Sequence, residues 1–346
     1  MAEPEISPET TGRPTGSSYW SLLIRAKAIR AAAALGFALH RLTHSLPSPS
    51  STTWVDSTLG GSKAKKAIRL DVYNPANTSK PVDDHARRPA MIVFHGGGFV
   101  LGSGTDDASY AASLTAHGMV VIAVSYRLAP EYPYPTPLED CASAILHIHK
   151  HSDQYRIDPS QLYISGFSAG GNLALSCLHL FNNPTKFQYN LPSSPPTFRG
   201  GILFYPLLDW TKTRAEKRNT CERPELTLPT GLTNLFDGSY LRPDLDLTDP
   251  LLSPGAASDA HLQSLPPLHL VLCEHDMLRR EGDELATRLK GLGKEVSARL
   301  VEGERHGWDK VPFAVKDSAA VEYQAAWEVL EDWLRREPAG TDTSTS

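Results

Sequence analysis

The sequence predicts an α/β fold in which a mainly parallel central sheet is flanked by helices on both faces. From residue 66 onward, short strand-like segments alternate with longer helix-like segments, the pattern typical of such a sheet. Two of the strand-like segments, "AMIVF" and "LHLVLC", are apolar almost throughout, as expected of central strands buried on both faces. With 346 residues and 40% hydrophobic content, the chain is long enough to bury a large core.

The two ends of the chain differ from the rest in composition. Residues 1–17 and 337–346 are rich in Pro, Gly, Ser, Thr and charge, which predicts a disordered N-terminus and a disordered tail. Between Trp20 and Leu42, within residues 18–48, apolar side chains recur at spacings of three and four, which predicts an amphipathic helix. Its longest apolar run is far shorter than the ~20 residues a membrane span requires. Packing on the protein is favoured over contact with a membrane surface, which stays an alternative.

The core is predicted in two parts, residues 49–209 and 255–336. Between them, residues 210–254 carry prolines, charges and short apolar pieces, which predicts an insertion of loops and short helices acting as a cap or lid. Strands are predicted at 67–73, 90–94, 120–126, 162–165, 201–205, 268–273 and 296–301, and helices at 110–117, 138–151, 169–181, 281–292 and 321–335.

Charge and cysteine content exclude several classes of protein. The net charge of −5 arises from 34 basic and 39 acidic residues with no long block of either sign, so nothing indicates a nucleic-acid partner, and a small molecule is the better default. The four cysteines lie far apart without a C-x-x-C pair, which argues against a disulfide framework and a structural zinc site. The first residues lack the basic start and apolar run of a secretory signal, so a cytoplasmic location is expected. No feature sets an oligomeric state.

The segment "LYISGFSAGG" places a serine between a strand and a helix. The predicted strand ends at Ser165, the pattern G-x-S-x-G runs from Gly166 to Gly170, and a helix-like segment follows at once. A turn this tight strains the serine backbone and exposes its hydroxyl at a helix N-terminus, which favours a nucleophilic role for Ser168. The alternative is an ordinary hydroxyl in a glycine-rich loop, since the pattern alone is weakly specific.

A second glycine-rich segment, "HGGGFVLGSG" at residues 95–104, follows the predicted strand 90–94. Consecutive glycines let backbone amides approach a ligand oxygen, so the amides of Gly97 and Gly98 are candidates to stabilise an oxyanion together with that of Ala169. The alternatives are a flexible loop or a dinucleotide phosphate site. The segment has no G-x-G-x-x-G opening a helix and no Walker lysine, which disfavours nucleotide binding.

Two further polar residues follow predicted strands. Asp276 comes after "LHLVLC", and His306 comes after the last strand. The chain order Ser168, Asp276, His306 is the order of a serine, acid and histidine triad on an α/β-hydrolase sheet. Asp276 is preferred because it leaves its strand directly, and the rival acids are Glu274, Asp283 and Asp309.

These motifs together resemble the hormone-sensitive-lipase-like branch of the α/β-hydrolases, over roughly residues 66–335. The resemblance is specific because it rests on six segments. They are "HGGGF" at 95–99, "YRLAPEYPYPTPLED" at 126–140, "GFSAGG" at 166–171, "DPLLSP" at 249–254, "DMLRREG" at 276–282 and "HGW" at 306–308.

The resemblance implies a carboxylester hydrolase with Ser168 as nucleophile, His306 as general base and Asp276 as its orienting acid. It also implies a three-amide oxyanion hole and a cap built from the N-terminal helix and the insertion. Two positions depart from the family pattern. Phe167 stands where an Asp is usual, and Trp308 stands where a Phe is usual. Neither transfers a proton, so these departures affect the expected pocket rather than the chemistry.

The remaining candidate residues have plain structural alternatives. His147 and His151 are spaced as metal ligands on a helix, but no acid completes an H-E-x-x-H motif, so no metal and no cofactor are expected. Five aromatic residues near the motifs are candidates either to line a substrate pocket or to belong to the core, namely Phe99, Phe167, Tyr205, Trp210 and Trp308.

The sequence therefore predicts a serine carboxylester hydrolase that acts on small to medium acyl or aryl esters through an acyl-enzyme. The alternative is an acyltransferase, lactonase, thioesterase or amidase of a biosynthetic pathway, because the same triad serves all of these reactions. A non-catalytic ligand receptor of the same fold is disfavoured, because the triad histidine is present as His306.

Overall fold

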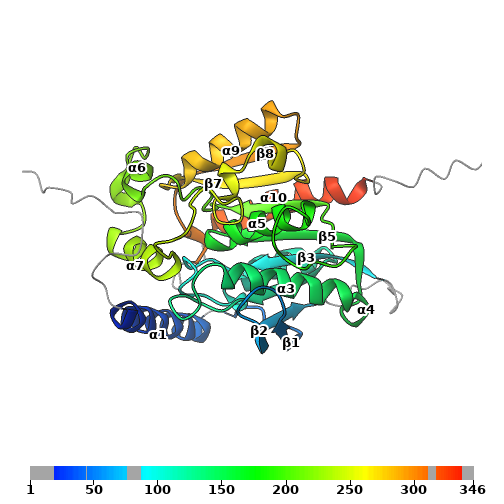
Figure 1. Ribbon diagram of the computed structural model, residues 1–346. Helices are drawn as coiled ribbons and strands as arrows, with labels where there is room; N and C mark the ends of the chain where they lie inside the picture. The colour runs from blue at the N-terminus through cyan, green and yellow to red at the C-terminus, as the bar shows by residue number, and fades with distance from the viewer. Residues whose placement is uncertain (1–18, 44, 76–86, 311–316, 337–346) are drawn as a thin grey trace, which may run out of the picture.

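The computed structural model describes residues 19–43, 45–75, 87–310 and 317–336 (Figure 1). The disorder expected at residues 1–17 and 337–346 falls outside them. The described chain forms one eight-stranded sheet in the order β1-β2-β4-β3-β5-β6-β7-β8. The strands are β1 (Ser51–Ser57), β2 (Ala64–Tyr73), β3 (Arg88–Phe94), β4 (Val120–Ser125), β5 (Ile157–Phe167), β6 (Gly200–Phe204), β7 (Leu268–His275) and β8 (Val296–Arg305).

The predicted mainly parallel sheet is confirmed. β3 pairs in parallel with β4 and β5, and parallel pairing continues through β6 and β7 to β8. Only β1 and β2 run antiparallel to their neighbours within the described sheet. Because the parallel strands share one direction, the residues that follow β3, β5, β7 and β8 all emerge at the same edge.

Helices cover both faces of this sheet. The longer helices are α1 (Tyr19–Thr43), α2 (Ala108–Ala116), α3 (Thr136–Lys150), α5 (Ala169–Asn182), α7 (Thr230–Tyr240), α9 (Arg279–Gly291) and α10 (Asp317–Arg335), and the shorter ones are α4 (Ser152–Tyr155), α6 (Arg214–Arg218) and α8 (Asp259–Leu262). Single 3-10 turns lie at η1 (Gly104–Asp107), η2 (Pro224–Leu226), η3 (Pro254–Ala256) and η4 (Trp308–Lys310).

The core divides into two apolar clusters, one on each face of the sheet. Along β3, Ile92 and Phe94 belong to the cluster beneath α3, α5 and α9, whereas Met91 and Val93 belong to the cluster beneath α2 and α10. This division follows from the alternation of side chains along a strand. It also explains why the central strands are apolar at nearly every position.

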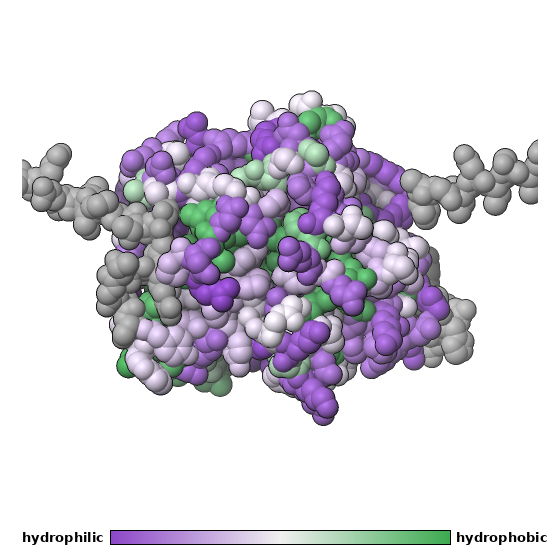
Figure 2. Space-filling model, viewed as in Figure 1, coloured by the Kyte–Doolittle hydropathy of each residue, from purple (hydrophilic) through white to green (hydrophobic). Residues whose placement is uncertain are grey.

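The insertion and the N-terminal helix lie together beyond the carboxyl edge of the sheet. Residues 210–254 form α6, η2 and α7 joined by loops, and α1 packs along α7 (Figure 1). The face seen in Figure 2 is largely hydrophilic, with hydrophobic patches near its centre and at the lower left edge, where α1 lies in Figure 1. Helix α1 and the insertion are thus neighbours in space, although they are far apart in the sequence.

Candidate active site

Ser168 lies on the turn between β5 and α5, in a backbone conformation that few non-glycine residues adopt. Its φ is 53° and its ψ is −113°, and its amide donates to Phe204 O at 2.9 Å. A Cβ on Gly166 would lie 2.1 Å from Gly170 O, and a Cβ on Gly170 would lie 2.0 Å from Phe94 O. The two flanking glycines are therefore required for the chain to turn this tightly.

Ser168, His306 and Asp276 form one hydrogen-bonded chain. His306 Nε2 lies 2.8 Å from Ser168 Oγ, and His306 Nδ1 lies 2.7 Å from Asp276 Oδ2. Asp276 is buried, and its other oxygen accepts from the amide of Leu278 at 3.0 Å. Two hydrogen bonds thus hold the carboxylate in place, and the carboxylate fixes which imidazole nitrogen faces the serine.

The rival acids have other partners. Glu274 Oε2 accepts from the amide of Gly303 at 2.6 Å, and Asp283 pairs with Arg279 at 3.5 Å on α9. Asp309 accepts from two tyrosine hydroxyls. Of the four acids considered from the sequence, Asp276 is the one that contacts His306.

The candidate oxyanion donors lie on the loop after β3 and at the start of α5, which meet beside Ser168. Gly97 and Gly98 have φ values of 106° and 59°, and Ala169 is the first residue of α5. In the described part of the chain, the amides of these three residues have no hydrogen-bond acceptor. A Cβ on Gly98 would lie 2.2 Å from the ring of Phe236 on α7, so only glycine fits there. Unpaired amides at a helix N-terminus suit a developing negative charge.

The five candidate aromatic residues are all buried. Phe99 stacks on Tyr240 with ring centroids 3.6 Å apart, and Phe167 stacks on Phe204 at 4.5 Å. The exposed fraction is 0% for Phe99 and Phe167, 2% for Tyr205 and Trp308, and 4% for Trp210. This burial agrees with the interpretation of these residues as core.

A polar cluster beneath the serine turn, which we call the Lys310 cluster, was not predicted from the sequence. It comprises Asp107, Tyr205, Asp309, Lys310 and Tyr323. Lys310 Nζ lies 2.8 Å from Asp107 Oδ1 and 2.5 Å from Asp309 Oδ2, and Asp309 accepts from Tyr205 at 2.5 Å and from Tyr323 at 2.7 Å. The cluster therefore joins η1, the residue that follows β6, α10, and η4, which comes soon after His306.

The Lys310 cluster also explains how Phe167 is accommodated. Lys310 Nζ stands 3.6 Å from the centroid of the Phe167 ring, within the range of a cation–π contact. Burial raises the pKa of Asp107 to about 6, against the opposing effect of Lys310. Burial lowers the pKa of Lys310, but the carboxylates of Asp107 and Asp309 outweigh it and raise that pKa above its usual value. No local motif links these residues, so only the folded chain reveals the cluster.

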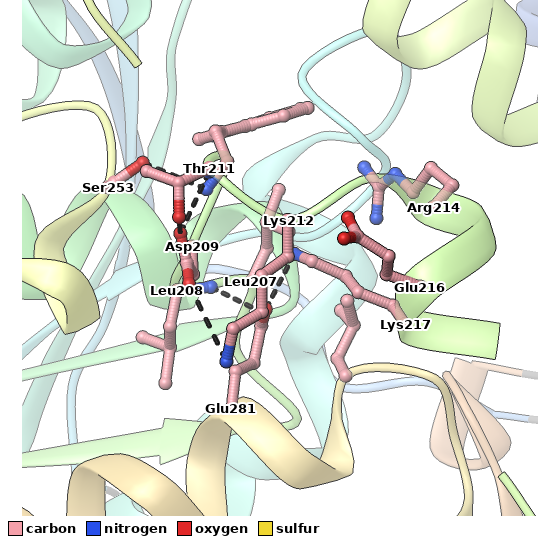
Figure 3. Close-up of polar contacts among 12 residues, drawn as sticks. Leu207, Leu208, Asp209, Thr211, Lys212, Arg214, Glu216, Lys217, Ser253 and Glu281 are labelled. Carbon is pink, nitrogen blue, oxygen red and sulfur yellow. Dashed lines mark hydrogen bonds and ion pairs between the residues drawn. The ribbon is translucent and has the colours of Figure 1, made fainter. Parts of the chain in front are cut away.

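The insertion is tied to the core by a buried ion pair, drawn in Figure 3. Lys217 Nζ of α6 lies 2.6 Å from Glu281 Oε2 of α9, and both side chains are only 4% exposed. Glu281 Oε1 also accepts from the amide of Leu208 at 2.6 Å. Burial lowers the pKa of Lys217 and raises the pKa of Glu281. This pair fixes α6 to the helix that begins three residues after Asp276.

The two helix histidines considered as metal ligands contact each other and a tyrosine. The rings of His147 and His151 stack with centroids 4.1 Å apart, and His147 Nε2 lies 3.1 Å from Tyr155 Oη. Across residues 19–43, 45–75, 87–310 and 317–336, no group of three His, Cys, Asp or Glu side chains is arranged to hold a metal ion.

Comparison with known proteins agrees with this geometry. A family model described as the alpha/beta hydrolase fold matches residues 91–310. An arylesterase of Saccharolobus solfataricus is 32% identical over 70% of this chain and 75% of its own length. Human arylacetamide deacetylase-like 2 is 30% identical over 69% of this chain and 71% of its own length.

Solved structures extend the likeness to most of the chain. A thermophilic carboxylesterase cloned from a metagenomic library superposes with a TM-score of 0.72 at 28% identity, covering 90% of this chain and 98% of that one. An esterase of Pyrobaculum calidifontis superposes with a TM-score of 0.74 at 26% identity, covering 89% and 91%. The family model, the relatives and the superposed folds agree, and the chain belongs to the α/β-hydrolase fold family, in its hormone-sensitive-lipase-like branch.

Proposed function

We propose that this chain is a serine carboxylester hydrolase that cleaves small to medium acyl or aryl esters through an acyl-enzyme. The observation that carries the proposal is the continuous chain from Ser168 Oγ to His306 Nε2 at 2.8 Å and from His306 Nδ1 to Asp276 Oδ2 at 2.7 Å. Relatives named as an arylesterase and a carboxylesterase support the ester as the substrate class.

Acylation begins when Ser168 Oγ attacks the ester carbonyl carbon while His306 Nε2 takes the hydroxyl proton. The carbonyl π electrons move to oxygen, and the resulting oxyanion accepts hydrogen bonds from the amides of Gly97, Gly98 and Ala169. Asp276 stabilises the imidazolium that has formed. The C–O bond to the alcohol then breaks, and His306 delivers its proton to the leaving alkoxide.

Deacylation repeats these steps with water as the nucleophile. His306 takes a proton from the water as its oxygen attacks the acyl carbon, and a second oxyanion forms at the same amides. When this intermediate collapses, Ser168 leaves and recovers its proton from His306. The products are one carboxylic acid and one alcohol for each ester cleaved.

The decisive experiment removes the proposed nucleophile alone. Ser168→Ala should abolish turnover of short p-nitrophenyl esters and labelling by a fluorophosphonate, while circular dichroism stays unchanged. Ser176→Ala is the matched control, because Ser176 is a buried serine on α5 whose hydroxyl has no hydrogen-bond partner among the described residues. Turnover that survives in Ser168→Ala would refute the assignment.

We also propose a cytoplasmic location. The four cysteines are all free, and three of them are buried. Burial raises the pKa of Cys177 and Cys273 above the usual value, which keeps these thiols protonated and unreactive. Unpaired thiols are typical of a reducing compartment.

A further inference from the structure

The outward face of α1 is an unusual concentration of exposed apolar side chains. Among the described residues, ten large hydrophobic side chains are exposed, and six of them lie on this one helix. Exposed fractions reach 67% for Trp20, 66% for Ile24, 62% for Leu35 and 82% for Leu42. Hydrophobic side chains are visible at the edge where α1 lies (Figures 1 and 2). The six are Tyr19, Trp20, Ile24, Leu35, Leu39 and Leu42.

These side chains form a continuous stripe. At about 100° per residue, positions 20, 24, 35 and 42 fall within one narrow sector of the helix, and the exposed Ala28, Ala31 and Ala38 lie among them. The opposite side already packs on the protein through Leu22 and Ala26, which are both fully buried. The helix therefore has two apolar faces, and the outward one has no described residue packed on it.

The charge of α1 indicates what this stripe contacts. The helix contains Arg25, Lys27, Arg30 and Arg41 and no acidic residue, whereas the whole chain carries −5. Lys27 lies beside the stripe, and its side chain is 63% exposed although Nζ also pairs with Glu131 at 3.1 Å. A stripe of Trp, Leu and Ile on a helix that carries basic and no acidic residues is the pattern of helices that lie in the surface of an anionic bilayer.

The helix is held firmly enough to present this face. Arg30 donates to Val100 O and Ala129 O at 2.6 Å each and pairs with Glu131 at 2.9 Å. Arg25 donates to Gly231 O of α7 at 3.0 Å. Because α1 is fixed to the body by these contacts, the stripe does not need to order itself on binding, which favours attachment to a surface.

We propose that the outward face of α1 docks this protein, without spanning, on an anionic lipid surface such as the cytoplasmic leaflet of a membrane. No helix in the described ranges is long and apolar enough to cross a bilayer. Residues 1–18 contain two large apolar side chains, Met1 and Ile6, fewer than the six of the stripe. The proposal is independent of ester hydrolysis, since it concerns only where the protein binds.

The test is co-sedimentation of the full chain with phosphatidylcholine vesicles that contain or lack phosphatidylserine. Binding should require phosphatidylserine and weaken as salt is raised, because salt screens the basic residues. The double variant Ile24→Glu, Leu35→Glu should bind at least about 100-fold more weakly. Lys27→Gln should weaken binding about 5-fold, the effect expected for one basic residue near the surface.

The matched control is the double variant Leu300→Glu, Val321→Glu, which removes two exposed apolar side chains elsewhere and adds the same charge. It should bind vesicles as the unaltered chain does. Circular dichroism and thermal unfolding establish that each variant is folded.

Absence of binding to phosphatidylserine vesicles at low salt would overturn the proposal, as would an equal loss in the control. A concentration-dependent dimer in light scattering, abolished by Ile24→Glu with Leu35→Glu and formed without vesicle binding, would also overturn it. That outcome would assign the stripe to a second copy of this chain.

Discussion

Lys310→Met provides a strict test of the Lys310 cluster, because it replaces a charge with an apolar side chain of similar length. Asp107 and Asp309 are 1% and 0% exposed at their side chains, and Lys310 is 20% exposed. Removing one partner of a buried pair costs about 3–5 kcal/mol. Asp309 keeps two tyrosine donors, whereas Asp107 has no other polar partner among the described residues. Because Lys310 retains some exposure, we expect Lys310→Met to reduce the free energy of unfolding by an amount near the lower end of this range, about 3 kcal/mol.

The loss of stability in Lys310→Met should depend on pH. The pKa of Asp107 is about 6 in the folded chain, above its ordinary value, because burial disfavours the carboxylate. The folded state therefore holds this proton more tightly than the unfolded state does. The raised pKa of Asp107 therefore stabilises the folded state fully below about pH 4, and this contribution is lost as the pH rises through about 6. Without Lys310, protonating Asp107 removes the unpaired charge, so the variant should be less impaired at pH 5 than at pH 8.

Urea unfolding of both proteins at pH 5 and pH 8 measures this difference. Lys212→Met is the control, since Lys212 is 40% exposed and pairs with Glu284 at 2.5 Å, and such a surface pair contributes about 0–1 kcal/mol. Lys310→Met should also lower kcat more than it raises KM, because Lys310 anchors the loop of His306. An equal loss of stability at both pH values would refute the electrostatic account of the cluster.

Three further substitutions test other parts of the structure. Asp276→Asn should lower kcat about 10⁴-fold with little change in KM, because an amide leaves the imidazole in the wrong tautomer. Single-turnover kinetics measure this effect, and an unchanged kcat would remove Asp276 from the proposed triad. Gly98→Ala should lower kcat about 10²–10³-fold, since its Cβ would meet the Phe236 ring at 2.2 Å and displace a donor amide; a normal kcat would show that this amide is not used. Lys217→Met should reduce the free energy of unfolding, measured in urea, by about 3–5 kcal/mol, because it leaves Glu281 buried without its cation. A loss below about 1 kcal/mol would contradict the claim that this ion pair stabilises the fold.

The central sheet and the position of each proposed catalytic residue could be predicted because their signals are local. A buried parallel strand appears in the sequence as an apolar run, and the residue after it emerges at the carboxyl edge. Ser168 and Asp276 each follow such a run, and His306 follows β8, an edge strand that is mostly exposed, so the meeting of the three follows from the parallel sheet. β1 (Ser51–Ser57) was missed because it is an edge strand with most side chains exposed, and its polar pattern does not distinguish it from a loop.

The Lys310 cluster and the exposed stripe of α1 could not be predicted, for different reasons. Asp107 and Lys310 are distant in the chain, and a lone charged residue in sequence is more often a solvated one. For α1, the three-and-four spacing did predict an apolar stripe. However, both sides of the helix are apolar, so the pattern could not say which side packs on α7 and which faces outward.

The contacts of α1 and α7 with the glycine-rich loop at residues 95–104 relate substrate choice to rate. Phe236 of α7 lies where a Cβ on Gly98 would be, and Arg30 of α1 donates to Val100 O, two residues farther along the same loop. Side chains of α1 and α7 therefore help to hold the loop whose amides are proposed to stabilise the oxyanion. A rigid donor set contributes to the rate only while it keeps its geometry to within a fraction of an ångström. Substitutions in α1 or α7 that disturb these contacts should consequently lower kcat, and not only alter KM, because the same contacts position the donor amides.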